Sequence, residues 1–189
     1  MTTGEVGLTY DVPFDSLEAL RANPDVVVQS GLSAHVWFVA LNNKLSDPPF
    51  DNKAVRQAMN HAIDKQGIVR DILQGTAEVS STPLSPIYGD VYNADVRKYP
   101  YDPAKAKALL AEAGYPDGFG NCEFMVPEIG SGMQSPFEMG TYIQANLAAV
   151  GIDCQIKTME WGPILRPTAT GRKWQKCQGT RPRVTLITC

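Results

Sequence analysis

The sequence has few of the side chains from which catalytic and metal sites are usually built. Its 189 residues include two histidines, His35 and His61, and four cysteines, none of which pair in a C-x-x-C spacing. Zinc sites need such ligands at short spacings, so we expect no metal and no cofactor. The motifs G-x-S-x-G and H-E-x-x-H are also missing, and neither histidine has a nucleophile motif beside it. We therefore expect no enzyme.

Long apolar runs and internal repeats are missing as well. No stretch approaches the roughly 20 apolar residues of a membrane-spanning helix, so we do not expect a membrane-spanning protein. Met1–Tyr10 has no basic start followed by an apolar run, so a signal peptide is not expected in this chain. With 43% hydrophobic residues, a chain of this length can bury one sizeable core.

A strong overall charge is absent, but the charges are unevenly placed. The net charge of -3 gives no reason to expect nucleic acid as a partner. Residues 166–189 nevertheless contain six basic and no acidic side chains, whereas residues 1–165 contain 11 basic and 20 acidic ones. A tail of this kind is usually a solvated or disordered arm. It differs in composition from the body of the chain.

The periodicity of the remaining sequence predicts an α/β fold. Expected helices cover residues 13–22, 48–64, 65–74, 136–150 and a segment from Pro103 to Gly114, and expected strands cover 26–29, 35–42, 122–126 and 153–159. Residues 76–100 are expected to form an extended surface connection. The last strand, helix and strand form a βαβ unit, so its two strands should be parallel.

Local signals set the expected helix ends. Asp51 is predicted to cap the helix before Asp64, and Asp102 to cap the helix that has Pro103 in its first turn. Ser135 and Glu138 have the spacing of a capping box. The strand over residues 35–42 is apolar on both faces, as is typical of a central strand.

Two alternatives remain open for Cys122 and Cys154, which lie near the starts of the two expected parallel strands. They are close enough for a disulfide if their Cα atoms lie within about 7 Å. They can equally be two buried thiols that act as small apolar residues.

Several segments resemble one family in the same order along the chain. They are G-E-x-x-x-x-Y-D-V-P from Gly4, P-P-F-D-N-K-A-V-R-Q-A-M-N-H-A-I-D over Pro48–Asp64, and Y-D-P-A-K-A-K-A-L-L-A-E-A-G-Y-P-D-G-F over Tyr101–Phe119. Together they resemble the C-terminal lobe of the family 5 extracellular solute-binding proteins, the peptide and nickel receptors of ABC importers. The resemblance covers about Gly4–Leu165, which implies part of the second lobe of a type II periplasmic binding protein.

The resemblance implies a receptor in the periplasm or outside the cell that binds peptides or a related small solute and delivers it to ABC permease subunits. Its two lobes would close on the ligand. Receptors for nickel chelates, haem or opine-like solutes are alternatives within the class. A truncated product that binds nothing, or an isolated α/β interaction module, is the alternative from another class.

The resemblance also implies which residues meet the ligand. The family's E-W element, here Glu160-Trp161, contributes an aromatic ring that lies against the bound peptide, although Trp161 can equally be a core residue. Dipeptide-binding members carry an arginine where this chain has Gly130, so dipeptide specificity is not expected. The loop that contains Gly130, Ser131 and Met133 is expected to contact a ligand through backbone groups.

The basic tail suggests a shift of the reading frame near Arg166. Permitted codons for residues 167–189, read in another frame, give Y-S-N-G-Q-E-V-A-E-M-S-G-Y-T-T-T-R-D-P-D-N-L, which resembles the family's continuation with its D-P-D motif. We therefore expect residues 1–165 to be the partial lobe, and residues 166–189 to be a disordered tail that is out of frame.

Overall fold

The computed structural model describes residues 4–10, 12–31, 33–43, 48–129, 133–160 and 183–188. The order of its elements begins with η1 (Phe14–Ser16), α1 (Leu17–Ala22), β1 (Trp37–Leu41), α2 (Lys53–Ala62), α3 (Lys65–Gly67), the π-helix η2 (Ile68–Ile72) and η3 (Pro86–Val91). It continues with α4 (Pro103–Glu112), β2 (Phe119–Pro127), α5 (Pro136–Ala148), β3 (Ile152–Met159) and β4 (Arg183–Thr188). The predicted α/β fold is confirmed.

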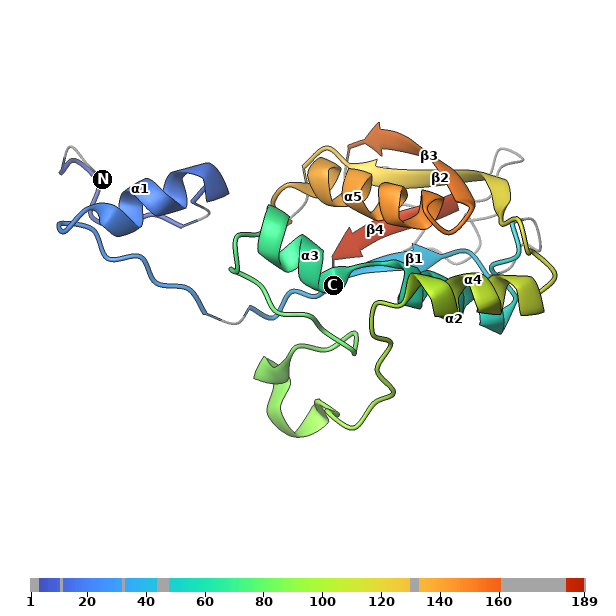
Figure 1. Cartoon of the computed structure of the whole chain (residues 1–189). Coiled ribbons are helices and arrows are strands. Elements are labelled where there is room, and N and C mark those ends of the chain that lie inside the picture. Colours follow the sequence, from blue (N-terminus) through green and yellow to red (C-terminus); the bar gives the residue numbers. More distant parts are fainter. Residues whose placement is uncertain are drawn as a thin grey trace.

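The sheet has the strand order β1-β4-β2-β3. β2 and β3 are parallel, as the βαβ pattern predicts, and α5 between them in sequence packs against both. α2 packs against α4 and α5. In Figure 1 the segment that contains α1 lies to one side of this body.

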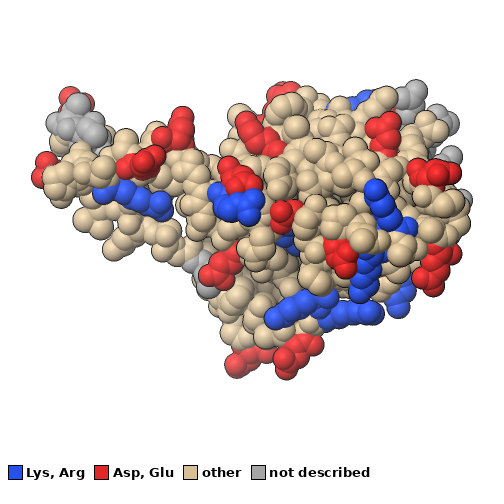
Figure 2. Space-filling view, viewed as in Figure 1, with Lys and Arg blue, Asp and Glu red and all other residues tan. Residues whose placement is uncertain are grey.

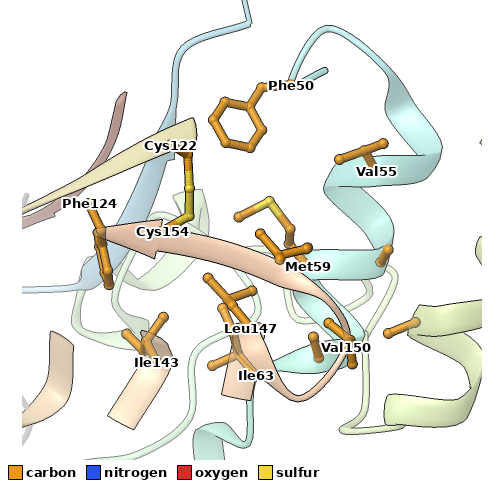
Figure 3. Close-up of a cluster of buried hydrophobic side chains, with 14 of the residues drawn as sticks. Phe50, Val55, Met59, Ile63, Cys122, Phe124, Ile143, Leu147, Val150 and Cys154 are labelled. Carbon is orange, nitrogen blue, oxygen red and sulfur yellow. A yellow bond between two sulfur atoms is a disulfide. The ribbon is translucent and has the colours of Figure 1, made fainter. Parts of the chain in front are cut away.

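The helices meet the sheet in one hydrophobic core (Figure 3). The apolar face predicted for the helix before Asp64 is confirmed, because Val55, Ala58, Met59 and Ala62 are all buried. They pack with Phe124 of β2, and with further residues of α5 and β3: Ile143, Leu147, Ile152 and Cys154. The hydrophobic core thus lies between the β2–β3 part of the sheet and the helices α2 and α5.

Two of the three predicted caps differ from the structure. Asp102 does accept a hydrogen bond from the backbone N–H of Lys105 at 2.9 Å. At α2, however, it is the side chain of Asn52 rather than Asp51 that accepts from the N–H of Ala54. Ser135 makes no side-chain cap hydrogen bond, because its backbone is left-handed, with φ of 50°. The predicted capping box is therefore wrong.

Two strand predictions are also corrected. Residues 26–29 form no strand, and Val27 is 80% exposed. A strand needs a neighbour for its backbone groups, and no described segment supplies one. β1 lies at the edge of the described sheet rather than in its centre, since β4 is its partner there.

The basic tail, residues 166–189, also differs in part from its prediction. Residues 183–188 form β4, so the expectation of disorder does not hold for them. Residues 166–182 and 189 lie outside the described residues. The shift of the reading frame and the boundary at residue 165 stay predictions.

Candidate functional site

The parallel pair β2 and β3 brings its two carboxyl ends together. Pro127 lies opposite Met159 in the register of the strands. One residue further, the backbone N–H of Glu128 donates to the carbonyl of Met159 at 3.0 Å. In open α/β sheets, ligands bind at the carboxyl ends of the strands. This carboxyl edge is therefore the candidate site.

The two segments that the sequence predicts to meet a ligand both leave from this edge. One begins at Glu128 and the other at Glu160, each directly after the last residue of its strand. Gly130, Ser131 and Trp161 themselves lie outside the described residues. What the structure does give is the position from which each segment starts, and these positions are side by side.

Met133 does not present its side chain to a ligand. Its side chain is 4% exposed and belongs to the hydrophobic core. The physical reason is that a long thioether chain gains more from burial than from water. Only a backbone role remains for Met133, and that is the kind of contact expected for this loop.

The exposed groups near the edge are of mixed chemistry. Glu128 and Glu160 are exposed and follow adjacent strands, and Ile129 is 80% exposed. Phe137, in the first turn of α5, is 49% exposed. Carboxylates beside apolar side chains can hold a ligand that has both a cationic and an apolar part. Sequence reasoning placed Ile129 in the loop from Glu128 to Met133 but expected only backbone contacts there, and it missed Phe137, for which the only signal was its place shortly after this loop.

Cys122 and Cys154 form a disulfide in the hydrophobic core (Figure 3). It lies toward the starts of β2 and β3, away from the carboxyl edge. The two residues are directly opposite in the register of β2 and β3, with 4.6 Å between their Cα atoms. They are 2% and 1% exposed. Of the two alternatives left open by the sequence, the structure has the disulfide.

Neither histidine belongs to the edge. His61 is 3% exposed, and its Nδ1 lies 2.7 Å from the carbonyl oxygen of Pro100. Gln57 and Lys65 lie four residues before and after His61. Both donate hydrogen bonds to Tyr99, the neighbour of Pro100 in the connection before α4. His35 is exposed and hydrogen-bonds Ser33. The His61 contact is thus structural, and the four-residue spacing of these polar side chains was its signal in the sequence.

The groups with shifted pKa values lie on α3, η2 and α5. Burial lowers the pKa of the Lys65 ammonium below its ordinary value. A hydrogen bond from Arg70 holds the pKa of the Asp71 carboxyl below its usual range. The pKa of the Tyr142 hydroxyl is raised, mainly by burial and then by the negative charge of Asp64. None of these groups belongs to the segments that leave the carboxyl edge.

The described residues offer neither a metal site nor a membrane-spanning helix in addition to the carboxyl edge. In that part of the chain, no three histidine, cysteine or acidic side chains are grouped so that they could hold a metal ion. Within the same ranges, no helix has the length and apolar character needed to cross a bilayer. Acidic and basic side chains are interspersed over the face seen in Figure 2.

Comparison with protein families gives one match. Residues 1–179 match the model of the bacterial extracellular solute-binding proteins, family 5. The chain is 38% identical over 155 residues to the heme-binding protein A of Haemophilus influenzae, covering 82% of this chain and 28% of that protein. It is 34% identical over 162 residues to the glutathione-binding protein GsiB of Pectobacterium atrosepticum, covering 86% of this chain and 30% of that protein.

Solved structures show the same fold. HbpA2 from Haemophilus parasuis has a TM-score of 0.76 and 29% identity, with 95% of this chain and 33% of that chain covered. The periplasmic binding protein DppA from Helicobacter pylori, in complex with the peptide STSA, has a TM-score of 0.73 and 31% identity. That comparison covers 93% of this chain and 31% of the other. The chain thus spans about a third of the length of these relatives.

Proposed function

The chain belongs to the bacterial extracellular solute-binding proteins of family 5, and on that basis we propose that it forms part of the solute-binding component of an ABC importer. The proposed location is the periplasm or the outer face of the cell. The proposed partners are the ligand and the permease subunits that receive it. A protein with this role is a receptor and does not transform its ligand.

The observation that carries this proposal is the junction of Glu128 with Met159 at the carboxyl edge. A ligand that touches the Glu128 loop lies next to the segment that begins at Glu160, because one backbone hydrogen bond joins the ends of the two strands. Ligand contacts made from the starts of these two segments would therefore fall close together, which is the property that a binding cleft needs.

We propose peptides or a closely related small solute as the ligand. Curated relatives at 30% identity or more include glutathione-binding and di/tripeptide-binding proteins, and glutathione is itself a peptide. The exposed Ile129 and the carboxylates of Glu128 and Glu160 suit a molecule with an apolar side chain and an ammonium group. Trp161 is proposed to lie flat against it.

Haem is the second candidate, and a specific observation favours it. Of the relatives named above, the heme-binding protein A has the highest identity, at 38%. Haem would also use an apolar edge such as Ile129 and Phe137 provide. The two ligands differ in the group that they present to Glu128 and Glu160, since haem carries carboxylates where a peptide carries an ammonium group.

Calorimetric titration of the chain with tripeptides, longer peptides, glutathione and haemin tests the proposal. We expect saturable heat with the peptide ligands, and a rise of the melting temperature at the same concentrations. Trp161→Ala should weaken binding by about tenfold, in the range of one lost aromatic contact. Tyr101→Ala, which removes a half-exposed aromatic ring before α4, is the matched control. No heat with any ligand identifies a fragment that does not bind, and heat with haemin alone identifies the second candidate.

A further inference from the structure

β1 runs opposite to β2 and β3, so it begins at the edge of the sheet where they end. β4 is parallel to β2, and Thr185 lies opposite Met125. β4 is antiparallel to β1, whose first residue, Trp37, lies opposite Thr188. Three residues beyond the Thr185 pair, β4 reaches Thr188 and the chain of β2 reaches Glu128. Trp37 is therefore level with the start of the Glu128 loop, with β4 between them (Figure 1).

The separation of Trp37 from the Glu128 loop matches the length of a short peptide. Neighbouring strands lie about 4.8 Å apart, so two strand spacings place Trp37 roughly 10 Å from Glu128. An extended chain advances about 3.3–3.6 Å per residue, so about three residues span this separation.

The side chain of Trp37 lies on the face of the sheet that packs against the hydrophobic core. Side chains of a strand alternate between the two faces, and Trp37, Val39 and Leu41 are the residues of β1 that contact the core. Trp37 as a whole is only partly buried. Its indole ring therefore lies at the boundary between the core and the carboxyl edge.

The indole N–H of Trp37 is buried without a hydrogen-bond partner. Among the described residues, Nε1 of Trp37 is the one buried side-chain nitrogen or oxygen atom of which this is true. Leaving a buried donor unpaired costs free energy, and a buried tryptophan N–H usually finds a partner. Because the indole N–H donates and cannot accept, the missing partner is an acceptor atom.

A buried water is a poor candidate for this partner. A buried water makes about three hydrogen bonds, typically to groups that are otherwise unpaired. In the part of the chain that the structure describes, no second buried side-chain atom is unpaired. A water at Trp37 would therefore find one such side-chain group, whereas an acceptor that belongs to a ligand needs no others.

We propose that Trp37 is a ligand-binding residue of the carboxyl edge, and that its indole N–H donates to a carbonyl or carboxylate oxygen of a bound peptide. This inference rests on the function proposed above and adds a contact from β1 to those of the Glu128 loop and the segment that begins at Glu160. It favours peptides of about three residues or more, which reach from Glu128 to Trp37.

Calorimetric titration of the full chain with trialanine tests this contact. Trp37→Phe keeps an aromatic ring and removes the N–H, so trialanine should bind about tenfold more weakly, as expected for one lost hydrogen bond. Phe38→Leu changes an aromatic residue on the opposite face of β1 and is the control, which should bind as the unchanged chain does. Equal binding by Trp37→Phe and the unchanged chain, or an equal loss in both variants, overturns the proposal.

The same titration separates the two proposals from each other. Heat with haemin but none with trialanine overturns the role of Trp37 and leaves a solute-binding chain. No heat with any of the ligands overturns both.

The NMR signal of the indole N–H gives a second measurement that leaves Trp37 unchanged. The chain has three tryptophans, Trp37, Trp161 and Trp174, so the variants Trp161→Phe and Trp174→Phe identify the Trp37 signal by elimination. This signal should move downfield when trialanine binds, because a hydrogen bond deshields the proton. A signal that is already downfield without ligand and stays there identifies a bound water. That result, or an upfield signal that does not move while trialanine binds, overturns the proposal.

Discussion

A β-carbon placed on Gly118 would lie 1.9 Å from the carbonyl oxygen of Gly151. The two glycines stand at the starts of β2 and β3, where the backbone N–H of Phe119 donates to that same carbonyl at 3.0 Å. Both have positive φ, of 80° and 92°. The close approach of the chain at the starts of β2 and β3 thus requires two residues without side chains.

Gly118→Ala should lower the free energy of unfolding by at least about 2 kcal/mol, because it adds a strained φ to a clash with backbone. Gly120→Ala is the matched control, since no atom lies within 4 Å of its added methyl group. Urea unfolding curves of the two variants measure the difference. Equal midpoints would show that the approach of the two strands is not tight.

Loss of the Cys122–Cys154 disulfide should destabilise the chain. The bridge closes a loop between residues 32 apart, and bridges of this kind contribute about 2–4 kcal/mol. Cys122→Ala with Cys154→Ala should lower the urea midpoint and make it insensitive to reductant, whereas the unchanged chain should respond to reductant. An unchanged chain with one midpoint under both conditions contradicts the bridge.

Lys157→Met should destabilise the chain by about 1–2 kcal/mol, because it withdraws a charged partner from a buried carboxylate. Lys157 Nζ lies 2.5 Å from Glu123 Oε1, and Glu123 is 4% exposed. Lys157 itself is half-exposed, so the ion pair contributes little beyond this. Glu123→Gln with Lys157→Met should recover part of the loss in thermal unfolding. If the double variant is as unstable as the sum of the singles, the two side chains do not act on each other.

Lys65 should make stability depend on alkaline pH. Burial lowers its folded-state pKa, so the unfolded state holds the proton up to a higher pH than the folded state does. The unfolded state thus binds more protons between the two pKa values, and the free energy of unfolding rises with pH in that window, which ends at the ordinary lysine pKa of about 10.4. Lys65→Met should remove this rise, measured by urea unfolding from neutral pH upward.

Lys107→Met is the control for that experiment, since Lys107 is an exposed lysine of α4. It removes the same charge without removing a buried group. A rise of the same size in Lys65→Met and in the control would assign the pH dependence to other groups.

The outcomes of the sequence predictions separate local signals from tertiary ones. Asp102 and Pro103 fix the start of α4 within four residues of chain, and the structure follows them. The strand predicted at residues 26–29 failed because β propensity is realised only beside a neighbour, and the described chain gives Val27 none. The capping box predicted at Ser135 failed because the left-handed backbone of this residue prevents the cap.

The candidate site shows the same division. The order of the last strand, helix and strand was enough to predict the parallel pair, but the use of its carboxyl edge as a candidate site came only from the structure. The burial of Met133 could not be predicted, since it depends on how the loop returns over the core. The position of β4 could not be predicted either, because strand order depends on contacts between segments far apart in sequence.

The hydrogen bond from Glu128 to Met159 has a mechanical consequence. It joins the bases of the two segments that leave the carboxyl edge, so moving one of them outward at its base either breaks this hydrogen bond or moves the other segment too. A ligand that pushes one segment outward at its base therefore acts on the other segment as well.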